Sequence, residues 1–302
     1  MLKVSAVILT YNRFDNLFNA IDSVINQDYL NMELIVSDDG SADFPYDEVD
    51  QYLKSNCPER IDNYRIITHK VNQGTVKNIN GAYRIAEGDI ILPLAEDDAF
   101  FDNTVVSRIV KEFEKRNCDV LITSRAVYDD HDKCVRIVPN SKEAKVLYTY
   151  DRKEIQYSRF ITHRFFEVCS GSVLYVRKAF IEKWGYFDEN YLLLEDMPFF
   201  ADYIWKNFLN CAFDIVSIKY REGGITAKKN PYLIKDYQMY KNIGQIKHID
   251  ELGWLDRSIV RYEIESFQED EWIGKACCAL KHLIGASAYS LYRIYRMLLI
   301  RI

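Results

Sequence analysis

The sequence predicts an α/β fold, with a mostly parallel central sheet flanked by helices and a helical extension at the C-terminus. Through residues 1–125, short apolar runs alternate with amphipathic segments, as they do in successive βαβ units. Polar residues that favour turns follow these apolar runs. Beyond residue 225 the pattern is helical up to the C-terminus. These observations predict a sheet-based domain at 1–225 and a helical region at 226–302.

The predicted sheet begins with five strands, each a short and largely apolar run. They are expected at Val4–Leu9, Glu33–Ser37, Tyr64–Thr68, Asp89–Leu94 and Asp119–Thr123. Apolar runs without strict alternation are typical of parallel strands that are buried on both faces. Four segments between them have helical spacing. These helices are expected at Phe14–Gln27, Tyr46–Ser55, Thr75–Ala86 and Thr104–Lys115.

The middle of the chain has a weaker pattern. Residues 126–168 are polar, aromatic and without a clear period, and we expect irregular structure there. Strands are then predicted at Ser172–Val176 and Cys211–Ile218, and helices at Lys178–Trp184 and Met197–Asn207. These elements complete the predicted domain.

Composition narrows the class of protein. The formal net charge of −6 argues against nucleic acid as a partner, because binding to phosphate backbones favours a basic surface. The seven cysteines are scattered, without a Cys-x-x-Cys pair or a Cys/His cluster, so neither a zinc site nor a disulfide framework is predicted. Met1 leads directly into an apolar strand without a signal-peptide pattern. We therefore expect a cytoplasmic protein.

Polar residues follow four successive predicted strands, at Thr10–Arg13, Ser37–Ser41, Asn72–Gly74 and Glu96–Asp98. The carboxyl ends of parallel strands meet at one edge of a sheet, where the ligands of such sheets bind. Any one of these groups is explained equally well by a helix cap or a turn. Four groups at one edge, two of them with paired carboxylates, favour a binding site.

Asp97 and Asp98 form the most informative pair. Adjacent carboxylates repel each other, so crowding them favours a counter-cation. Mg²⁺ and Mn²⁺ bind a few carboxylate oxygens and leave positions for water and substrate phosphates, and such a cation neutralises a diphosphate leaving group. The sequence has no G-x-G-x-x-G, G-x-x-x-x-G-K-[ST] or G-x-S-x-G motif. Dinucleotide-binding, P-loop and hydrolase-elbow sites therefore lack their defining loops.

A third acidic pair, Glu195–Asp196, precedes the helix expected from Met197. An acid at this position is often only a partner of the helix dipole. The functional interpretation is a general base, which takes the proton of an acceptor hydroxyl.

Taken in order, these motifs resemble the family 2 glycosyltransferases of GT-A fold. The resemblance covers roughly residues 3–225. It is carried by Thr10–Arg13, Asp38–Ser41, Asn72–Asn78, Ala95–Asp98 and Glu195–Asp196. It implies an inverting hexosyltransferase of bacterial polysaccharide assembly. The donor would be a nucleotide-sugar, with a UDP-sugar expected, and the acceptor a hydroxyl of a glycan or of a lipid-linked molecule.

The resemblance also implies roles for single residues. In the loop Thr10-Tyr11-Asn12-Arg13, Thr10 and Tyr11 would hold the nucleobase together with Asp39. Asp97 would lie near the ribose and phosphates, and Lys77 would help to neutralise phosphate, although a solvated helix lysine is the simpler interpretation. For the metal, Asp98 would bind Mn²⁺ or Mg²⁺.

On the acceptor side, the resemblance makes Asp196 the base and Glu195 a neighbour that contacts or orients the acceptor. The sequence also departs from the family. Ala95 stands where the metal motif usually begins with Asp, so donor-sugar contacts from that position are lost. Glu222 replaces a histidine that often lies near the metal, in a segment expected to form a mobile loop on the acceptor side.

The C-terminal stretch from Trp272 to Ile302 contains no Asp or Glu. Its basic residues are Lys275, Lys281, His282, Arg293, Arg296 and Arg301, interspersed with apolar and aromatic residues. This pattern suits a helix in the membrane interface, which would place the protein peripherally on the inner face of the cytoplasmic membrane. The alternative is a helix that packs on the catalytic domain or on another subunit.

Three other classes of protein compete with this interpretation. A sugar-phosphate nucleotidyltransferase would carry a glycine-rich loop after the first strand, where Thr10–Arg13 stands. A phosphoacceptor receiver domain would place its paired aspartates after the first strand, whereas here the first pair follows the second. A non-catalytic GT-A-like domain that binds sugar or a partner would not need Asp97, Asp98 and Asp196 together.

Overall fold

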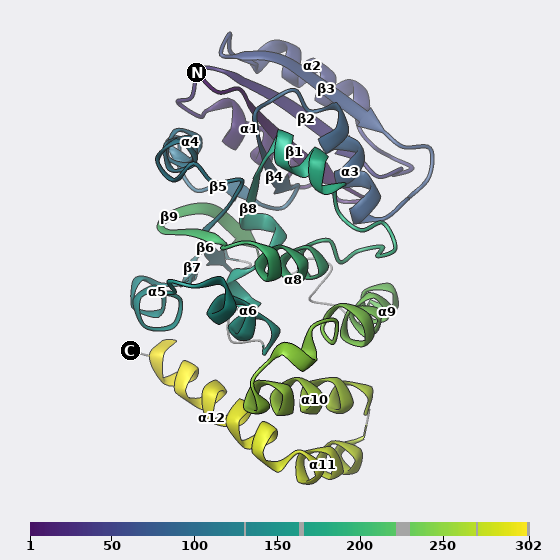
Figure 1. Cartoon of the computed structure of the whole chain (residues 1–302). Coiled ribbons are helices and arrows are strands. Elements are labelled where there is room, and N and C mark those ends of the chain that lie inside the picture. The colour runs from purple at the N-terminus through teal and green to yellow at the C-terminus, as the bar shows by residue number, and fades with distance from the viewer. Residues whose placement is uncertain (130, 163–165, 222–229, 270, 301–302) are drawn as a thin grey trace.

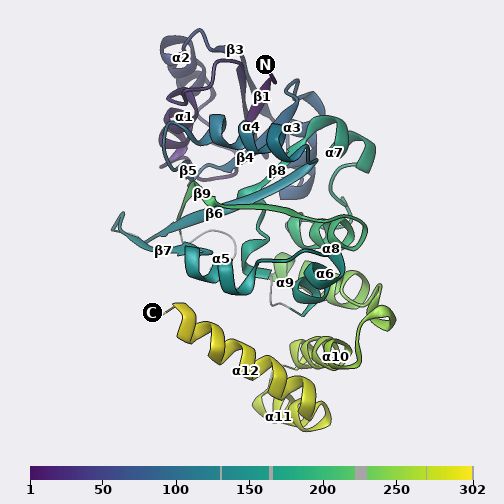
Figure 2. The same cartoon turned by 60° about the vertical axis from the view of Figure 1, so that its left-hand side comes forward.

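The computed structural model describes residues 1–129, 131–162, 166–221, 230–269 and 271–300. Within these residues a nine-stranded mixed sheet passes through the molecule, with helices packed on both of its faces (Figures 1 and 2). The predicted α/β class and the helical C-terminal extension are confirmed.

The first half of the sheet is parallel. Strands β1 (Val4–Thr10), β2 (Met32–Asp38), β3 (Ile61–Thr68) and β4 (Ile90–Ala95) lie in the order β3–β2–β1–β4. β2 is buried along its whole length and β1 nearly so, which is why both strands are apolar without alternation.

Helices connect these strands at almost the predicted positions. They are α1 (Leu17–Ile25), α2 (Tyr46–Asn56), α3 (Thr75–Ile85) and α4 (Val105–Arg116). The first begins three residues later than expected, because the polar loop after β1 extends to Asn16. That loop is part of the site described below.

The second half of the sheet is mixed. β8 (Leu174–Arg177) lies between β4 and β6 (Val120–Tyr128) and is antiparallel to both. β9 (Asn210–Arg221) is parallel to β6, and the short β5 (Ala99–Phe100) pairs with its far edge. α7 (Lys178–Trp184) has the predicted bounds, and α8 (Asp196–Lys206) begins at the acidic pair.

The prediction of irregular structure at 126–168 is wrong for most of that segment. β6 continues to Tyr128 and pairs with β7 (Cys134–Val138), and the helices α5 (Ser141–Leu147) and α6 (Lys153–Ile161) follow. Asn140 and Glu143 form a reciprocal capping box at the start of α5, a signal that the sequence contained. β7 has mostly exposed side chains, so it lacks the buried face that produces a strand pattern.

Helices α9 (Pro231–Met239) and α10 (Trp254–Gln268) share a hydrophobic core with the sheet through Leu233 and Val260, and Tyr240, directly after α9, belongs to the same core. The Asp236 carboxylate accepts hydrogen bonds from the backbone N–H groups of Leu192, Leu193 and Leu194, at 2.9, 2.6 and 3.2 Å. The domain boundary predicted at 225/226 falls in residues 222–229, outside the described residues, and it stays a prediction.

The last two helices, α11 (Trp272–Lys281) and α12 (Leu283–Ile300), lie with α10 at the end of the molecule opposite β3 (Figures 1 and 2). Arg296 of α12 pairs with Glu143 of α5 at 3.7 Å and with Glu167. Of the helices in the described part of the chain, none combines the length and apolar character that crossing a membrane requires.

Candidate active site

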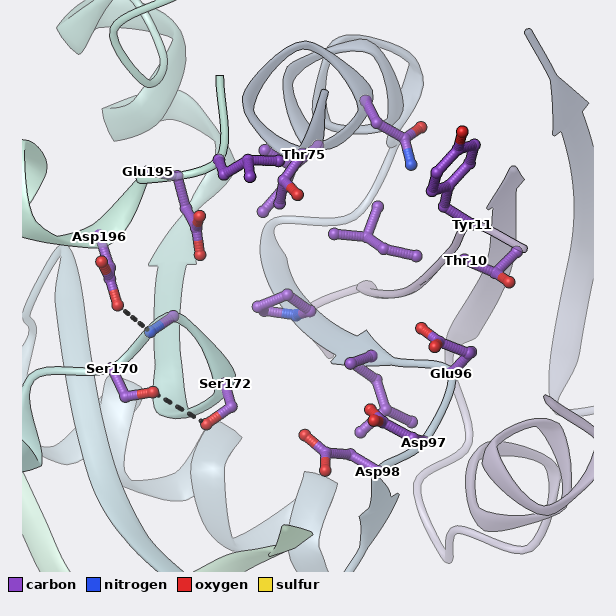
Figure 3. A pocket seen from close by; sticks show the side chains of 18 of the residues that line it. Thr10, Tyr11, Thr75, Glu96, Asp97, Asp98, Ser170, Ser172, Glu195 and Asp196 are labelled. Atoms are coloured by element: carbon purple, nitrogen blue, oxygen red, sulfur yellow. Dashed lines mark hydrogen bonds between the residues drawn. The ribbon is translucent and has the colours of Figure 1, made fainter. Parts of the chain in front are cut away.

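A cavity of about 320 Å³ lies between the carboxyl ends of β1 and β4 and the start of α8 (Figure 3). Most of the predicted site residues line it. They are Thr10, Tyr11, Arg13, Asp39, Asp97, Asp98, Glu195 and Asp196. The volume is within the range of ordinary small-molecule sites, and its position is where α/β sheets bind ligands.

The loop after β1 is held in a fixed shape. The Thr10 hydroxyl donates to the carbonyl of Arg13 at 2.9 Å, and the backbone N–H of Asn12 donates to the Ser41 hydroxyl at 2.8 Å. Asn12 has a φ of 53°, a left-handed conformation that asparagine tolerates. Asn12 is exposed and does not line the cavity, whereas the ring of Tyr11, 40% exposed, does.

Asp39 is buried and joins two loops of this wall. Its carboxylate oxygens accept from the backbone N–H groups of Gln73 and Gly74, at 2.9 and 2.8 Å. Burial raises the pKa of Asp39, and these two hydrogen bonds oppose the rise. Gly74 has a φ of 91°, and a Cβ there would lie 2.4 Å from Leu192 Cδ1, so the glycine of this motif is required by a close approach.

Three consecutive acidic residues follow β4. Asp98 is buried, and its Oδ1 accepts from the backbone N–H of Arg221 at 3.1 Å. Arg13 Nη1 pairs with Asp97 at 2.9 Å, and its Nε lies 3.8 Å from Glu96. Burial, then repulsion by Asp97, raises the pKa of Glu96 to about 7 and raises that of Asp98 well above its usual range.

This crowded acidic wall suits a divalent cation, because added positive charge would relieve the repulsion that raises these pKa values. Among the described residues, no group of three or more His, Cys, Asp or Glu side chains is arranged to hold a metal ion.

Glu195 and Asp196 lie on a different side of the cavity (Figure 3). Asp196 accepts from the backbone N–H groups of Gly171 and Met197, at 3.1 and 2.7 Å. Burial, followed by the charge of its neighbour Asp196, raises the pKa of Glu195, and burial also raises that of Asp196. A Cβ on Gly171 would lie 2.3 Å from Glu195 Oε1, so the loop before β8 is fitted closely to this pair.

Two of the predicted site residues lie outside the cavity, and the sequence did not predict several residues that line it. Lys77 is exposed on α3 and, like Asn12, does not line the cavity. The missed residues include Asn78, Ser170, Gly171, Ser172, Leu233 and Tyr237. Asn78 belongs to a motif singled out in the sequence, and its amide exchanges hydrogen bonds with Ser37 at 2.6 and 3.2 Å. No local pattern marks Tyr237, which reaches the cavity only through the packing of α9. Glu222 lies outside the described residues.

The model of the family described as "Glycosyl transferase family 2" matches residues 5–183. A UDP-Glc:alpha-D-GlcNAc-diphosphoundecaprenol beta-1,3-glucosyltransferase, WfaP of Escherichia coli, is 26% identical over 251 residues, which cover 81% of this chain and 88% of that protein. Matches to three further glycosyltransferases cover only 40%, 51% and 41% of the lengths of those relatives.

Solved structures are similar in fold. S. aureus TarS (residues 1–349) in complex with UDP-GlcNAc has a TM-score of 0.63 at 16% identity, covering 94% of this chain and 82% of that one. The mannosyltransferase PcManGT from Pyrobaculum calidifontis, in complex with GDP-Man and Mn²⁺, has a TM-score of 0.58 at 15% identity, covering 95% and 75%. At these identities the likeness concerns the fold, and it agrees with the predicted GT-A architecture.

Proposed function

The chain belongs to glycosyl transferase family 2, and on that premise we propose that it moves a hexose from a UDP-sugar to a hydroxyl of a lipid-linked glycan, with inversion at the anomeric carbon. The observation that carries the proposal is the placement of two acidic groups on different sides of one cavity (Figure 3). Asp97 and Asp98 suit a metal-bound diphosphate, whereas Glu195 and Asp196 suit the acceptor.

The nucleotide is proposed to bind on the wall formed by Thr10, Tyr11 and Asp39. The partly exposed Tyr11 ring offers a stacking surface for the base. Each Asp39 oxygen accepts one backbone N–H and retains acceptor capacity, so the carboxylate can also read a donor on the uracil edge. Asn12 would act through its bond to Ser41, and Lys77 would contact phosphate from the exposed face of α3.

Asp98, with Asp97 beside it, is proposed to hold Mn²⁺ or Mg²⁺. When bound, the cation would supply positive charge to the diphosphate, which is the leaving group. Arg13, already paired with Asp97, adds a second positive charge at the same edge of the cavity.

Asp196 is proposed to take the proton of the acceptor hydroxyl. The acceptor oxygen bonds to the anomeric carbon while the bond from that carbon to the diphosphate breaks, so a single displacement inverts the configuration. Glu195, packed over Gly171, would orient the acceptor. The raised pKa of Asp196 suits this role, because a base whose pKa is closer to the operating pH is the better proton acceptor.

Calorimetric titration with UDP and with GDP, each with and without Mn²⁺, tests the donor site. The proposal expects UDP to bind, to prefer Mn²⁺, and to be selected over GDP. Absence of binding by both nucleotides under both conditions would favour a non-catalytic domain. Preference for GDP would retain the reaction but overturn the assigned donor.

We further propose that α12 places the protein on a membrane surface that carries the acceptor. On α12, six large apolar side chains at helical spacing are more than half exposed: Leu283, Ile284, Leu291, Ile294, Met297 and Leu298. Ala286, on the packed face of the same helix, is 8% exposed. Lys281 pairs with Glu265 at 2.6 Å, and Arg296 pairs with Glu143. The exposed surface is therefore more apolar and less basic than the sequence suggests.

Co-sedimentation with phosphatidylcholine vesicles, with and without phosphatidylglycerol, tests this surface. The unmodified protein should bind, and the double variant Leu291→Glu/Leu298→Glu should not. Leu30→Glu, at a loop position that is 66% exposed, is the matched control and should bind normally. Self-association of the unmodified protein that the double variant abolishes, without vesicle binding, would assign α12 to a subunit interface instead.

A further inference from the structure

Helix α9 contributes two residues to the wall of the cavity. Leu233 and Tyr237 both line it, and they lie four residues apart, so they project from one face of the helix. Both lie outside residues 5–183, the segment that the family model matches. This part of the wall therefore comes from a region of the chain that the family match does not cover.

α9 is held against the segment that leads into the acidic pair. The buried carboxylate of Asp236 accepts from the backbone N–H groups of Leu193 and Leu194, at 2.6 and 3.2 Å. Glu195 follows Leu194 directly, and Tyr237 follows Asp236, so these hydrogen bonds place Tyr237 beside the acidic pair. Burial raises the pKa of the Tyr237 hydroxyl, and the charges of the pair raise it further, which agrees with this position.

Three tyrosine rings line the cavity, and they differ in what covers them. Tyr11 lies on the wall proposed for the nucleobase. The guanidinium of Arg125 lies over the ring of Tyr220, 5.1 Å from its centroid. Tyr237 is half-buried, and no aromatic ring or cation of the described residues stacks on it. Tyr237 thus offers the cavity an uncovered ring beside the proposed base.

A sugar acceptor needs a surface of this kind. A pyranose ring presents C–H groups on its faces and hydroxyls around its edge. Packing one face on an aromatic ring removes apolar surface from water and leaves the hydroxyls free to react or to form hydrogen bonds. Because one acceptor hydroxyl has to reach Asp196, the sugar that carries it lies on the same side of the cavity as Tyr237. Leu233 extends the apolar surface by one helical turn.

We propose that Tyr237, together with Leu233, forms the platform on which the pyranose ring of the acceptor packs, so that α9 determines which acceptor is used. The inference rests on the proposed function and deepens it. It assigns the acceptor side of the cavity to a glycoside with an apolar C–H face. Tyr237 binds the acceptor and exchanges no proton in the reaction, because the proton of the acceptor hydroxyl passes to Asp196.

Transfer from UDP-glucose to a lipid diphosphate-linked GlcNAc, the donor and acceptor in the name of WfaP, tests this platform in Tyr237→Ala and Tyr237→Phe. Loss of a stacked ring costs about three- to tenfold in affinity. Tyr237→Ala should therefore raise the KM of the acceptor by that factor, while the KM of UDP-glucose and the Kd of UDP with Mn²⁺ stay unchanged. Tyr237→Phe keeps the ring and should keep the original acceptor KM.

Tyr232→Ala is the matched control. Tyr232 also lies on α9, but it is 62% exposed and does not line the cavity, so this variant should leave both KM values unchanged. An unchanged acceptor KM in Tyr237→Ala would overturn the proposal, as would an equal rise in Tyr237→Phe, which would assign the effect to the hydroxyl. A rise confined to the KM of UDP-glucose would assign Tyr237 to the donor instead. Tyr237→Leu, which keeps apolar volume without a flat ring, serves if the alanine variant does not fold.

Saturation-transfer NMR with methyl N-acetyl-α-glucosaminide, in the presence of UDP and Mn²⁺, tests the platform without turnover. The unmodified protein should saturate the C–H protons on one face of the sugar, and Tyr237→Ala should not. Sugar binding of this kind without any transfer would support the platform and overturn the proposed reaction. Transfer by the unmodified protein without sugar binding would overturn the platform alone, and the absence of both would overturn both.

Discussion

The two walls of the cavity are built in different ways. The wall proposed to bind the donor, called the nucleotide wall, carries Thr10, Tyr11, Asp39 and Glu96–Asp98. It comes from consecutive strand ends, β1 to β4, whose loops are fixed by local hydrogen bonds such as those from the N–H groups of Gly40 and Ser41 to Asp38, at 3.1 and 2.9 Å. The wall that carries Glu195 and Asp196 is assembled from segments far apart in the chain, including Gly171 and Tyr237. Donor binding is therefore expected to depend on local motifs, and transfer on long-range packing.

The walls also differ in how they hold negative charge. The nucleotide wall crowds Glu96, Asp97 and Asp98 together, and Arg13 faces them from a partly exposed position. In the other wall, Asp196 accepts hydrogen bonds from the backbone N–H groups of Gly171 and Met197. The first arrangement suits a site that gains a cation with its ligand, whereas the second suits a preformed base.

The largest effect is expected from Asp196→Asn. Loss of a general base costs about 10²–10⁴-fold in rate, so transfer should fall by that factor while Mn²⁺-dependent UDP binding stays within about threefold of the original, because the nucleotide wall is intact. Transfer rates and calorimetry on the same preparation measure both. Normal transfer by this variant would show that Asp196 is not the base, and the two walls would then no longer differ in function as proposed.

Asp98→Ala should give the opposite pattern. Even residues that only support metal ligands cost about 10–100-fold in affinity when replaced, so Mn²⁺-dependent UDP binding should weaken by at least about tenfold. Binding of UDP without metal should change little. Calorimetric titration with UDP, with and without Mn²⁺, measures both affinities. Unchanged Mn²⁺ dependence would mean that the metal binds elsewhere.

A smaller loss is expected from Gly171→Ala, which disturbs only the Asp196 wall. The added Cβ would lie 2.3 Å from Glu195 Oε1, and displacing a reacting group costs about tenfold or more in rate. UDP affinity should be unchanged. Gly253→Ala is the control, since a Cβ there meets nothing within 4 Å. Equal transfer by the two variants would mean that the loop before β8 does not fix the acidic pair.

The smallest effect is expected on stability. The pKa of Glu96 is raised from its ordinary value of 4.5 to about 7. The unfolded chain therefore releases this proton first, so folding stability is lost as pH rises from 4.5 to 7. At pH 7.5 Glu96→Gln should remove a penalty on the order of 1–3 kcal/mol and raise the Tm by a few degrees. At pH 4 the two proteins should melt alike. Equal Tm values at pH 7.5 would show that neither burial nor repulsion by Asp97 destabilises the folded protein through the Glu96 carboxylate.

The sequence predicted the strand-end side of the cavity well, because the residues of each of its loops are adjacent in the chain. Continuous apolar runs marked β1, β2 and β4, since burial on both faces leaves no room for alternation. Turn chemistry then placed Thr10–Arg13 and Glu96–Asp98 at one edge. The requirement for glycine at 74 also belongs to this wall, although its reason, a close approach to Leu192, was not visible.

The sequence failed where an element depends on its neighbours. β7 has few buried side chains and exists because β6 offers it an edge. The capping box of Asn140 and Glu143 was readable, but the short helix after it carried too few residues to show a period. The basic character of the C-terminal stretch was visible in the sequence, but the pairing of Lys281 and Arg296 with acids of α10 and α5 was not.

The sequence by itself determined the α/β class, the four loops at the sheet edge and the identity of the acidic residues. The tertiary structure decided that Glu195 and Asp196 line the same cavity as Asp98 and that Tyr237 reaches it from α9. The physical reason is the separation along the chain of the residues that form each wall. The loops at the strand ends are formed by residues that are adjacent in the sequence. The opposite wall forms only when β8 lies antiparallel between β4 and β6. It also requires the hydrogen bonds from the backbone of Leu192, Leu193 and Leu194, directly before Glu195, to Asp236 of α9.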